Sequence, residues 1–177
     1  MAKWMVVALW LCVGMLSLSA QQAPTGEAAE SQLGFYLGKW TEEGQSRAKP
    51  TGAFGKITGE ESCAWFSGGP SVVCRETTQD QSGETDSIYI LAFDASRKLY
   101  TVYGTDNVGT IYSGTGTVDQ AGVWRWTAEA RAKGVVTPMR YTFRSAGNGS
   151  RTMDVEVAAG KGVWAKIVGV TYKRAAR

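Results

Sequence analysis

Apolar and polar residues alternate along much of the chain with a period of two. Between residues 138 and 145, Met139, Tyr141 and Phe143 alternate with arginine and threonine residues. Successive side chains of a β-strand point to opposite faces, so this pattern predicts strands with one wet face and one buried face. Strand-like runs lie near 38–46, 54–66, 71–79, 86–94, 98–105, 109–118, 122–129, 138–145, 151–158 and 163–173.

Turn-forming residues separate these runs, and Asn148-Gly149 is the strongest hairpin dipeptide among them. This dipeptide also begins a formal glycosylation sequon with Ser150, but the turn explains it without a sugar. Strands joined only by short turns must run antiparallel, because a parallel pair needs a long crossover. Such a meander either splits into a sandwich or closes on itself, and closure removes exposed edges. We therefore predict an all-β, antiparallel up-and-down barrel of about ten strands.

Helical character is sustained in one segment, 28–37, which we expect to form a short helix over one end of the barrel. A weaker helical tendency at 127–133 overlaps a predicted strand. The runs 88–93 and 163–172 are apolar on both faces, so we expect the helix or a protein partner to cover them.

The N-terminal segment has the parts of a secretory signal peptide. Lys3 is followed by an apolar stretch from Trp4 to Leu18 and by the small pair Ser19-Ala20. The stretch is shorter than the roughly 20 apolar residues of a membrane span, although an uncleaved anchor is the alternative. We expect a signal peptide at 1–20, a polar leader at 21–30 and the barrel domain at 31–177. The mature protein would be exported to the periplasm or the exterior, with no membrane span.

Two cysteines remain after this processing, Cys63 and Cys74, and they flank a turn cluster that contains Pro70. A four-residue loop, 67–70, spares the proline a ladder hydrogen bond that it cannot donate. It also makes the cysteines a non-hydrogen-bonded pair, in which the two strands approach closely. We predict a structural disulfide, which export would favour; two buried thiols are the alternative.

Catalytic chemistry is limited by the residues present. The chain has no histidine, which excludes Ser-His-Asp and Cys-His catalysis and histidine-based zinc sites. The net charge is +3 with both signs interspersed, unlike the basic surface of a nucleic-acid-binding protein. We predict no enzyme, no catalytic residue and no metal site. The acidic pairs are interpreted as surface residues. The direct neighbours Glu42-Glu43 and Glu60-Glu61 diverge across a strand, whereas Asp154 and Glu156 share a face, which is the wet one.

Large apolar residues gather on the dry faces of neighbouring predicted strands. They are Trp124, Trp126, Met139, Tyr141, Phe143 and Met153. These side chains either line a cavity for a flat or apolar small molecule or simply fill the core. The first alternative predicts a carrier or sensor of a small hydrophobic ligand. The second predicts an envelope interaction domain with a filled core, whose outer strands meet an unidentified protein partner.

The segment around Gly38 and Trp40 resembles the opening of lipocalin-like barrels, which carry Gly-x-Trp on the first strand after a short helix. This resemblance implies that Trp40 plugs the closed end against a basic residue of the last strand, Lys173 or Arg174. The end of the chain, with Glu156, the run 160–164 and the run 172–174, is similar to a bacterial secreted lipocalin-like (calycin-type) family of unknown function.

More distantly, the sequence resembles nitrobindin and fatty-acid-binding barrels. The haem carriers among them use a histidine ligand, which this chain lacks, so no cofactor is expected. The fatty-acid carriers use inward Arg and Tyr, but Arg140 and Tyr141 are adjacent and point to opposite faces.

Overall fold

The computed structural model of the protein describes residues 26–175. The expected signal peptide and residues 21–25 of the expected leader lie outside the described residues. Within the described part no helix is long and apolar enough to cross a membrane.

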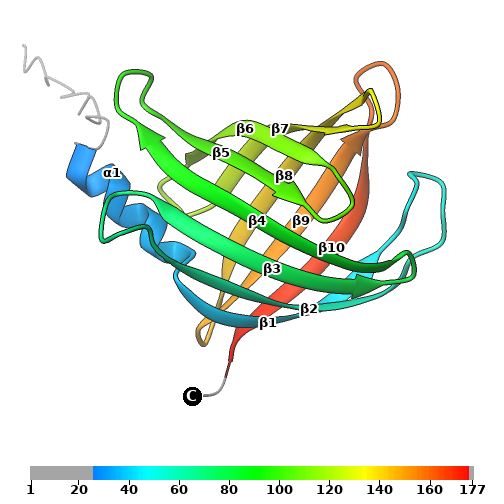
Figure 1. The fold of residues 1–177 in the computed structure, drawn as a ribbon, viewed down its shortest axis with the longest axis horizontal. Helices are drawn as coiled ribbons and strands as arrows, with labels where there is room; N and C mark the ends of the chain where they lie inside the picture. The colour runs from blue at the N-terminus through cyan, green and yellow to red at the C-terminus, as the bar shows by residue number, and fades with distance from the viewer. Residues whose placement is uncertain (1–25, 176–177) are drawn as a thin grey trace, which may run out of the picture.

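Ten antiparallel strands form a closed barrel, as predicted (Figure 1). Each strand pairs with the next in the chain, and β10 pairs back with β1, so that Trp40 lies opposite Arg174. The strands are β1 (Gly38–Ser46), β2 (Gly55–Trp65), β3 (Val72–Asp80), β4 (Gly83–Asp94), β5 (Leu99–Asp106), β6 (Ile111–Val118), β7 (Trp124–Ala132), β8 (Val135–Gly147), β9 (Ser150–Ala158) and β10 (Trp164–Arg174). The weak helical tendency at 127–133 is overridden, because β7 buries Trp126 and Ala128 on the inner face.

A short helix precedes the barrel, as predicted, and lies at one end of it (Figure 1). The α-helix α1 (Gly26–Gln32) continues into a 3-10 turn, η1 (Leu33–Phe35). Ala29 and Leu33 are fully buried, and the Tyr100 hydroxyl donates a hydrogen bond to the Ala29 carbonyl at 2.8 Å. The helix begins inside the segment 21–30 expected as a polar leader, so the folded domain starts before residue 31.

The hairpin between β2 and β3 carries the predicted disulfide. Cys63 and Cys74 are directly opposite, with a Cα–Cα distance of 4.1 Å, and their sulfurs are bonded. The loop has the four residues 67–70, because the Phe66 amide donates to the Ser71 carbonyl at 2.8 Å. The register that Pro70 favours therefore brings the cysteines together on the inner face of the barrel.

The Asn148-Gly149 turn joins β8 and β9 with φ angles of 49° and 69°. Both lie in the left-handed region that a tight two-residue hairpin requires, as the sequence predicts.

The two strands predicted to be apolar on both faces have different surroundings. On β10, Trp164 lies beneath the Arg140 guanidinium, 3.8 Å from the ring centroid. On β4, Ile90 lies directly opposite Tyr103 of β5, and these outward side chains are 42% and 61% exposed. A protein partner for this outer pair stays a prediction.

Candidate binding site

The barrel interior holds a cavity of about 230 Å³. The cavity lies between the end of the barrel that carries the helix and the opposite end, where a loop joins β1 to β2. Most of its lining is aliphatic or aromatic. Its polar groups are the Glu76 carboxyl, the Ser87 hydroxyl and the hydroxyls of Tyr36, Tyr89, Tyr112, Tyr141 and Tyr172. The filled core of the alternative interpretation is therefore absent from this part of the described barrel.

Five of the six residues expected to contact a ligand line this cavity: Trp126, Met139, Tyr141, Phe143 and Met153. They come from β7, β8 and β9, whose registers place Trp126 opposite Tyr141 and Phe143 opposite Met153. Trp124 is the exception. Its ring stacks on Trp126, with centroids 5.9 Å apart, and lies outside the cavity lining.

Trp124 belongs instead to an aromatic cluster that closes the helix end. Tyr36, which follows η1, packs edge-on against Trp124 and Phe143 at centroid distances of 5.2 and 5.4 Å. The Trp126 indole N–H donates to the Tyr36 hydroxyl at 2.9 Å, and the Trp40 indole N–H donates to the Tyr36 carbonyl at 3.0 Å. Burial raises the pKa of Tyr36, so its hydroxyl is neutral. This cluster forms the floor of the cavity.

The residues of the Gly-x-Trp resemblance lie at the outer side of this floor. The Arg174 guanidinium lies 4.3 Å from the centroid of the Trp40 ring, whereas Lys173 pairs with Thr41 across the sheet. Gly38 has a φ of 117°, and a Cβ there would lie 2.2 Å from the Arg174 Nη1. Glycine at this position therefore lets Arg174 reach the tryptophan.

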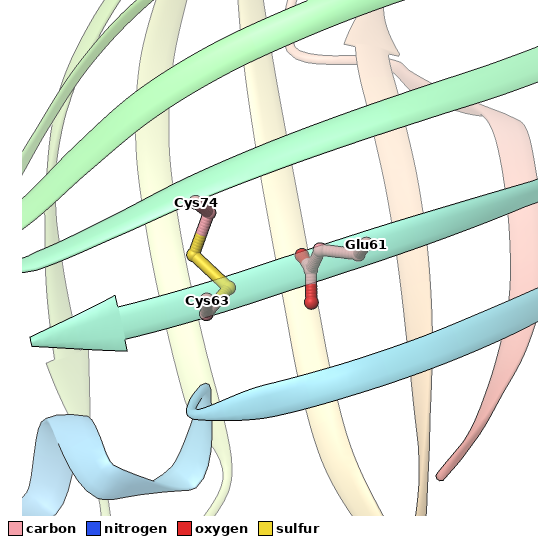
Figure 2. A group of neighbouring side chains, drawn as sticks. All are labelled: Glu61, Cys63 and Cys74. Atoms are coloured by element: carbon pink, nitrogen blue, oxygen red, sulfur yellow. A yellow bond between two sulfur atoms is a disulfide. The ribbon is translucent and has the colours of Figure 1, made fainter. Parts of the chain in front are cut away.

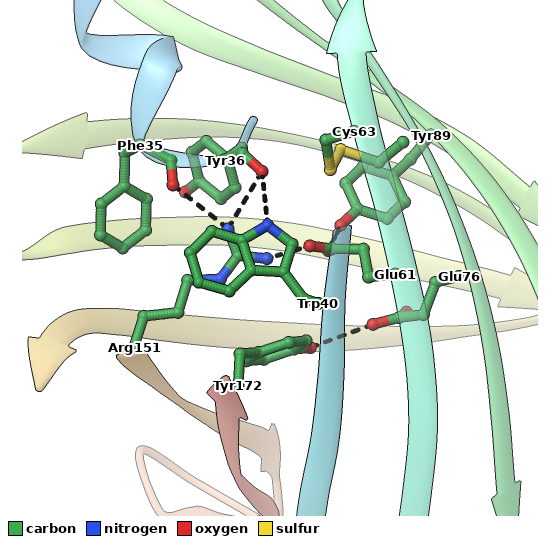
Figure 3. The surroundings of a disulfide bond; sticks show 10 residues. Phe35, Tyr36, Trp40, Glu61, Cys63, Glu76, Tyr89, Arg151 and Tyr172 are labelled. Carbon is green, nitrogen blue, oxygen red and sulfur yellow. Dashed lines mark hydrogen bonds and ion pairs between the residues drawn. A yellow bond between two sulfur atoms is a disulfide. The ribbon is translucent and has the colours of Figure 1, made fainter. Parts of the chain in front are cut away.

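A second arginine, which the sequence analysis missed, lies on the inner side of Trp40 (Figure 3). Arg151 of β9 is 1% exposed and forms an ion pair with Glu61 of β2. Its Nη1 donates to the carbonyls of Phe35 and Tyr36 at 3.3 and 3.4 Å. Arg151 thus ties the helix end to the barrel wall.

Carboxyl groups from three neighbouring strands gather beside this arginine. Glu61 lies directly opposite Glu76 of β3, and Glu42 of β1 is also inside the barrel. Glu42 and Glu61 are 4% and 2% exposed, so their interpretation as surface acids is wrong. The neighbours in the pairs Glu42-Glu43 and Glu60-Glu61 do diverge, and Glu42 and Glu61 then enter the interior, where they converge.

Tyrosine hydroxyls donate hydrogen bonds to two of these carboxyls. Tyr89 donates to Glu61, and Tyr172 donates to the Oε1 of Glu76 at 3.0 Å (Figure 3). The Oε1 of Glu42 has no hydrogen-bond partner among the described residues. It lies over Gly59, where a Cβ would come within 2.6 Å of it.

Burial and mutual repulsion favour the protonated forms of these carboxyls. Burial and, to a smaller extent, the charge of Glu61 raise the pKa of Glu42 to about 7, against the opposing effects of a hydrogen bond with Tyr172 and of the Arg151 charge. Burial, followed by the charges of Glu42 and Glu61, holds the pKa of Glu76 well above its usual value. Burial also raises the pKa of Glu61, which Arg151 opposes. One guanidinium thus lies beside three carboxyls, and it forms its ion pair with Glu61.

The alternation of inward and outward side chains along each strand was the signal that could have found these residues. Arg151 has the same parity as Met153 of the dry face of β9, and Glu42 has the same parity as Trp40. A charged residue in the buried phase of a strand is a candidate for an interior polar group.

Glu61 also lies near the disulfide, and one ligand atom from each of Glu61, Cys63 and Cys74 falls within 4.8 Å of the others (Figure 2). The sulfurs are bonded to each other and offer no thiolates. In the oxidised protein this group is therefore part of the barrel wall.

Comparisons with known proteins place this barrel in context. Residues 27–174 match a family model described as "Protein of unknown function (DUF1579)". No curated protein matches the sequence. Among solved structures, the S-type phycobiliprotein lyase CPES from Guillardia theta is similar, with a TM-score of 0.55 and 8% identity over 87% of this chain and 99% of that one. At this identity the likeness shows a shared fold alone.

Proposed function

The chain belongs to the DUF1579 family of unknown function, and from that premise we propose that it is an exported protein that holds a small, largely apolar molecule inside its barrel. The description of this family names neither secretion nor lipocalins, so the closed barrel is the part of the expected resemblance that the structure confirms.

The cavity is the observation that carries this proposal. Protein interiors leave few voids larger than a water molecule, whereas the space here is about 230 Å³. Its walls combine apolar and aromatic side chains with a few hydroxyls and one carboxyl, which is the usual composition of a small-molecule site. The aromatic cluster around Tyr36 blocks the helix end, so a ligand would enter from the end where the hairpins turn.

Export and the absence of catalysis belong to the same proposal. The Cys63–Cys74 disulfide supports export, because such bonds persist in oxidising compartments. The similar solved structure is named a lyase. We propose binding without catalysis for this chain, because it has no histidine and both described cysteines are joined in the disulfide.

Binding of a neutral apolar dye tests the proposal. Nile red should bind the purified full-length protein with enhanced fluorescence. Val102 of β5 lines the cavity, so Val102→Phe should place a ring in that space and weaken binding by about tenfold or more. Thr101→Phe is the matched control, because residue 101 is the outward neighbour and should leave the affinity unchanged.

Native mass spectrometry of protein purified from its own host gives a second readout, in which a bound ligand appears as additional mass. Absence of dye binding together with the mass of the bare chain would contradict the proposal. An equal effect of the two phenylalanine variants would place the dye outside the cavity.

A further inference from the structure

Acidic groups outnumber basic groups inside the described part of the barrel. Three carboxyls lie in the interior, and the one guanidinium beside them is used by Glu61 and by the carbonyls of Phe35 and Tyr36. Among the described residues that line the cavity there is one acidic side chain, Glu76, and no basic side chain.

Glu76 is placed to meet a ligand. It points inward from the middle of β3, between Glu61 on one neighbouring strand and Ser87 on the other. The Tyr172 hydroxyl donates to its Oε1 at 3.0 Å, and this hydrogen bond orients the carboxyl. Glu76 is half-buried although the wall encloses it, because its accessible surface faces the cavity.

A second observation concerns Glu42, which lies behind the cavity lining and in the same charged group as Glu76. One of its carboxylate oxygens, Oε1, is buried and has no hydrogen-bond partner among the described residues. An unpaired buried acceptor costs free energy that a donor or a positive charge nearby would recover.

We propose that the ligand carries a protonated amine, which pairs with the carboxylate of Glu76, while its apolar part lies against the aromatic lining. This inference rests on the proposed function and names the chemical class that the same cavity selects. An ammonium group supplies a positive charge, which the described cavity lining lacks, together with N–H donors for a carboxylate. Aromatic rings such as those of Tyr141 and Tyr172 line the same space and also favour a cation over an anion.

The same geometry disfavours carboxylic acids as ligands. A carboxylate would find no basic side chain in the described lining of the cavity, and a buried charge without an opposite partner is costly in an apolar site. An apolar amine, an alcohol and an acid of equal chain length should therefore bind in that order.

Binding should also release a proton. The groups that face Glu76 are Glu42 of β1, Glu61 of β2, Tyr89 of β4, Tyr141 of β8, Arg151 of β9 and Tyr172 of β10. Because burial, and after it the charges of Glu42 and Glu61, hold the pKa of Glu76 high, the acid is protonated in the empty cavity. A bound ammonium favours the carboxylate, so the carboxyl proton leaves to solvent as the ion pair forms.

Displacement of Nile red by three matched probes tests this selectivity near neutral pH. We expect octylamine to bind about tenfold more tightly than 1-octanol, and octanoate to bind least. Glu76→Gln should bring octylamine to within about twofold of 1-octanol while leaving 1-octanol binding unchanged, which also shows that the variant is folded. Glu60→Gln, one position from Glu61 but outward, is the matched control.

Calorimetry in buffers of different ionisation enthalpy measures the proton. Octylamine should release protons from the unmodified protein and from the Glu60→Gln control, and Glu76→Gln should lose most of this release.

Two results would separate this inference from the proposed function. If Nile red and 1-octanol bind but octylamine binds no more tightly, the amine specificity is wrong and the proposed function stands. If neither the dye nor any of the three probes binds, the proposed function falls, and the amine specificity falls with it.

Discussion

Arg151 of β9 and Glu61 of β2 are 90 positions apart in the chain and form an ion pair inside the barrel, with side chains that are 1% and 0% exposed. The two strands are not neighbours in the sheet, so the pair spans the interior. Arg151 also holds the carbonyls of Phe35 and Tyr36. This one guanidinium connects the helix end, the β1–β3 wall and the β9 wall.

Removal of that guanidinium should therefore be costly. Arg151→Met leaves the Glu61 carboxylate buried without its partner, and we expect a loss of about 3–5 kcal/mol in the free energy of unfolding. The double variant Arg151→Met with Glu61→Gln removes the unpaired charge and should recover a large part of this loss. Urea unfolding measures both. A loss under about 1 kcal/mol for Arg151→Met would show that the pair does little for stability.

The barrel could be predicted because its signals are local. Alternation around Tyr141, the Asn148-Gly149 turn and the spacing of Cys63 and Cys74 each depend on residues close together in the chain. The interior group could not be predicted in the same way. The parity of Arg151 marked it as inward, but its pairing with Glu61 follows from barrel closure, which brings β9 to face β2.

The role of Trp124 and the burial of the helix could not be predicted from the sequence, for a related reason. Whether Trp124 lines a cavity or closes an end depends on where Tyr36 inserts, and the chain folds Tyr36 back only after η1. The burial of Ala29 beside Tyr100 also depends on a contact between distant parts of the chain. Local helix and strand propensities do not predict either contact.

The disulfide should contribute measurably to stability. It closes a loop with a sequence separation of 11, and the chain-entropy estimate for a loop of this size is about 3 kcal/mol. The variant with Cys63→Ala and Cys74→Ala should lose a free energy of this order in urea unfolding. Because the two residues are 5% and 0% exposed, reductant should act slowly on the native protein and quickly in urea. Identical thiol counts with and without reductant under unfolding conditions would exclude the bond.

The hydrogen bond between Trp126 and Tyr36 should hold the aromatic floor in place. Tyr36→Phe removes the acceptor of the buried indole N–H, and we expect a cost of about 1–3 kcal/mol. Adding Trp126→Phe should give a double variant whose total cost is less than the sum of the two single costs, since the missing partner matters only once. Tyr103→Phe, on a side chain that is 61% exposed, is the control and should change stability by under about 0.5 kcal/mol. Additive costs would show that the bond does not couple the two rings.

Stability should fall as pH rises from about 4.5 to about 7. Burial raises the pKa of Glu42 from 4.5 to about 7, so the folded protein binds this proton more tightly than the unfolded chain. The resulting stabilisation is complete below about pH 4.5 and is lost between there and about pH 7, a total of about 3 kcal/mol. Glu76, whose pKa burial also raises, changes stability in the same direction.

Glu42→Gln should flatten the dependence of stability on pH. The variant should also be more stable than the unmodified protein above neutral pH, because glutamine stays uncharged. The control Glu43→Gln alters an exposed partner of Lys56 and should keep the slope. A rise in stability from pH 5 to pH 8 would contradict this prediction. It would show that Glu42 is ionised in the folded barrel and that its negative charge is balanced by a group other than a bound proton.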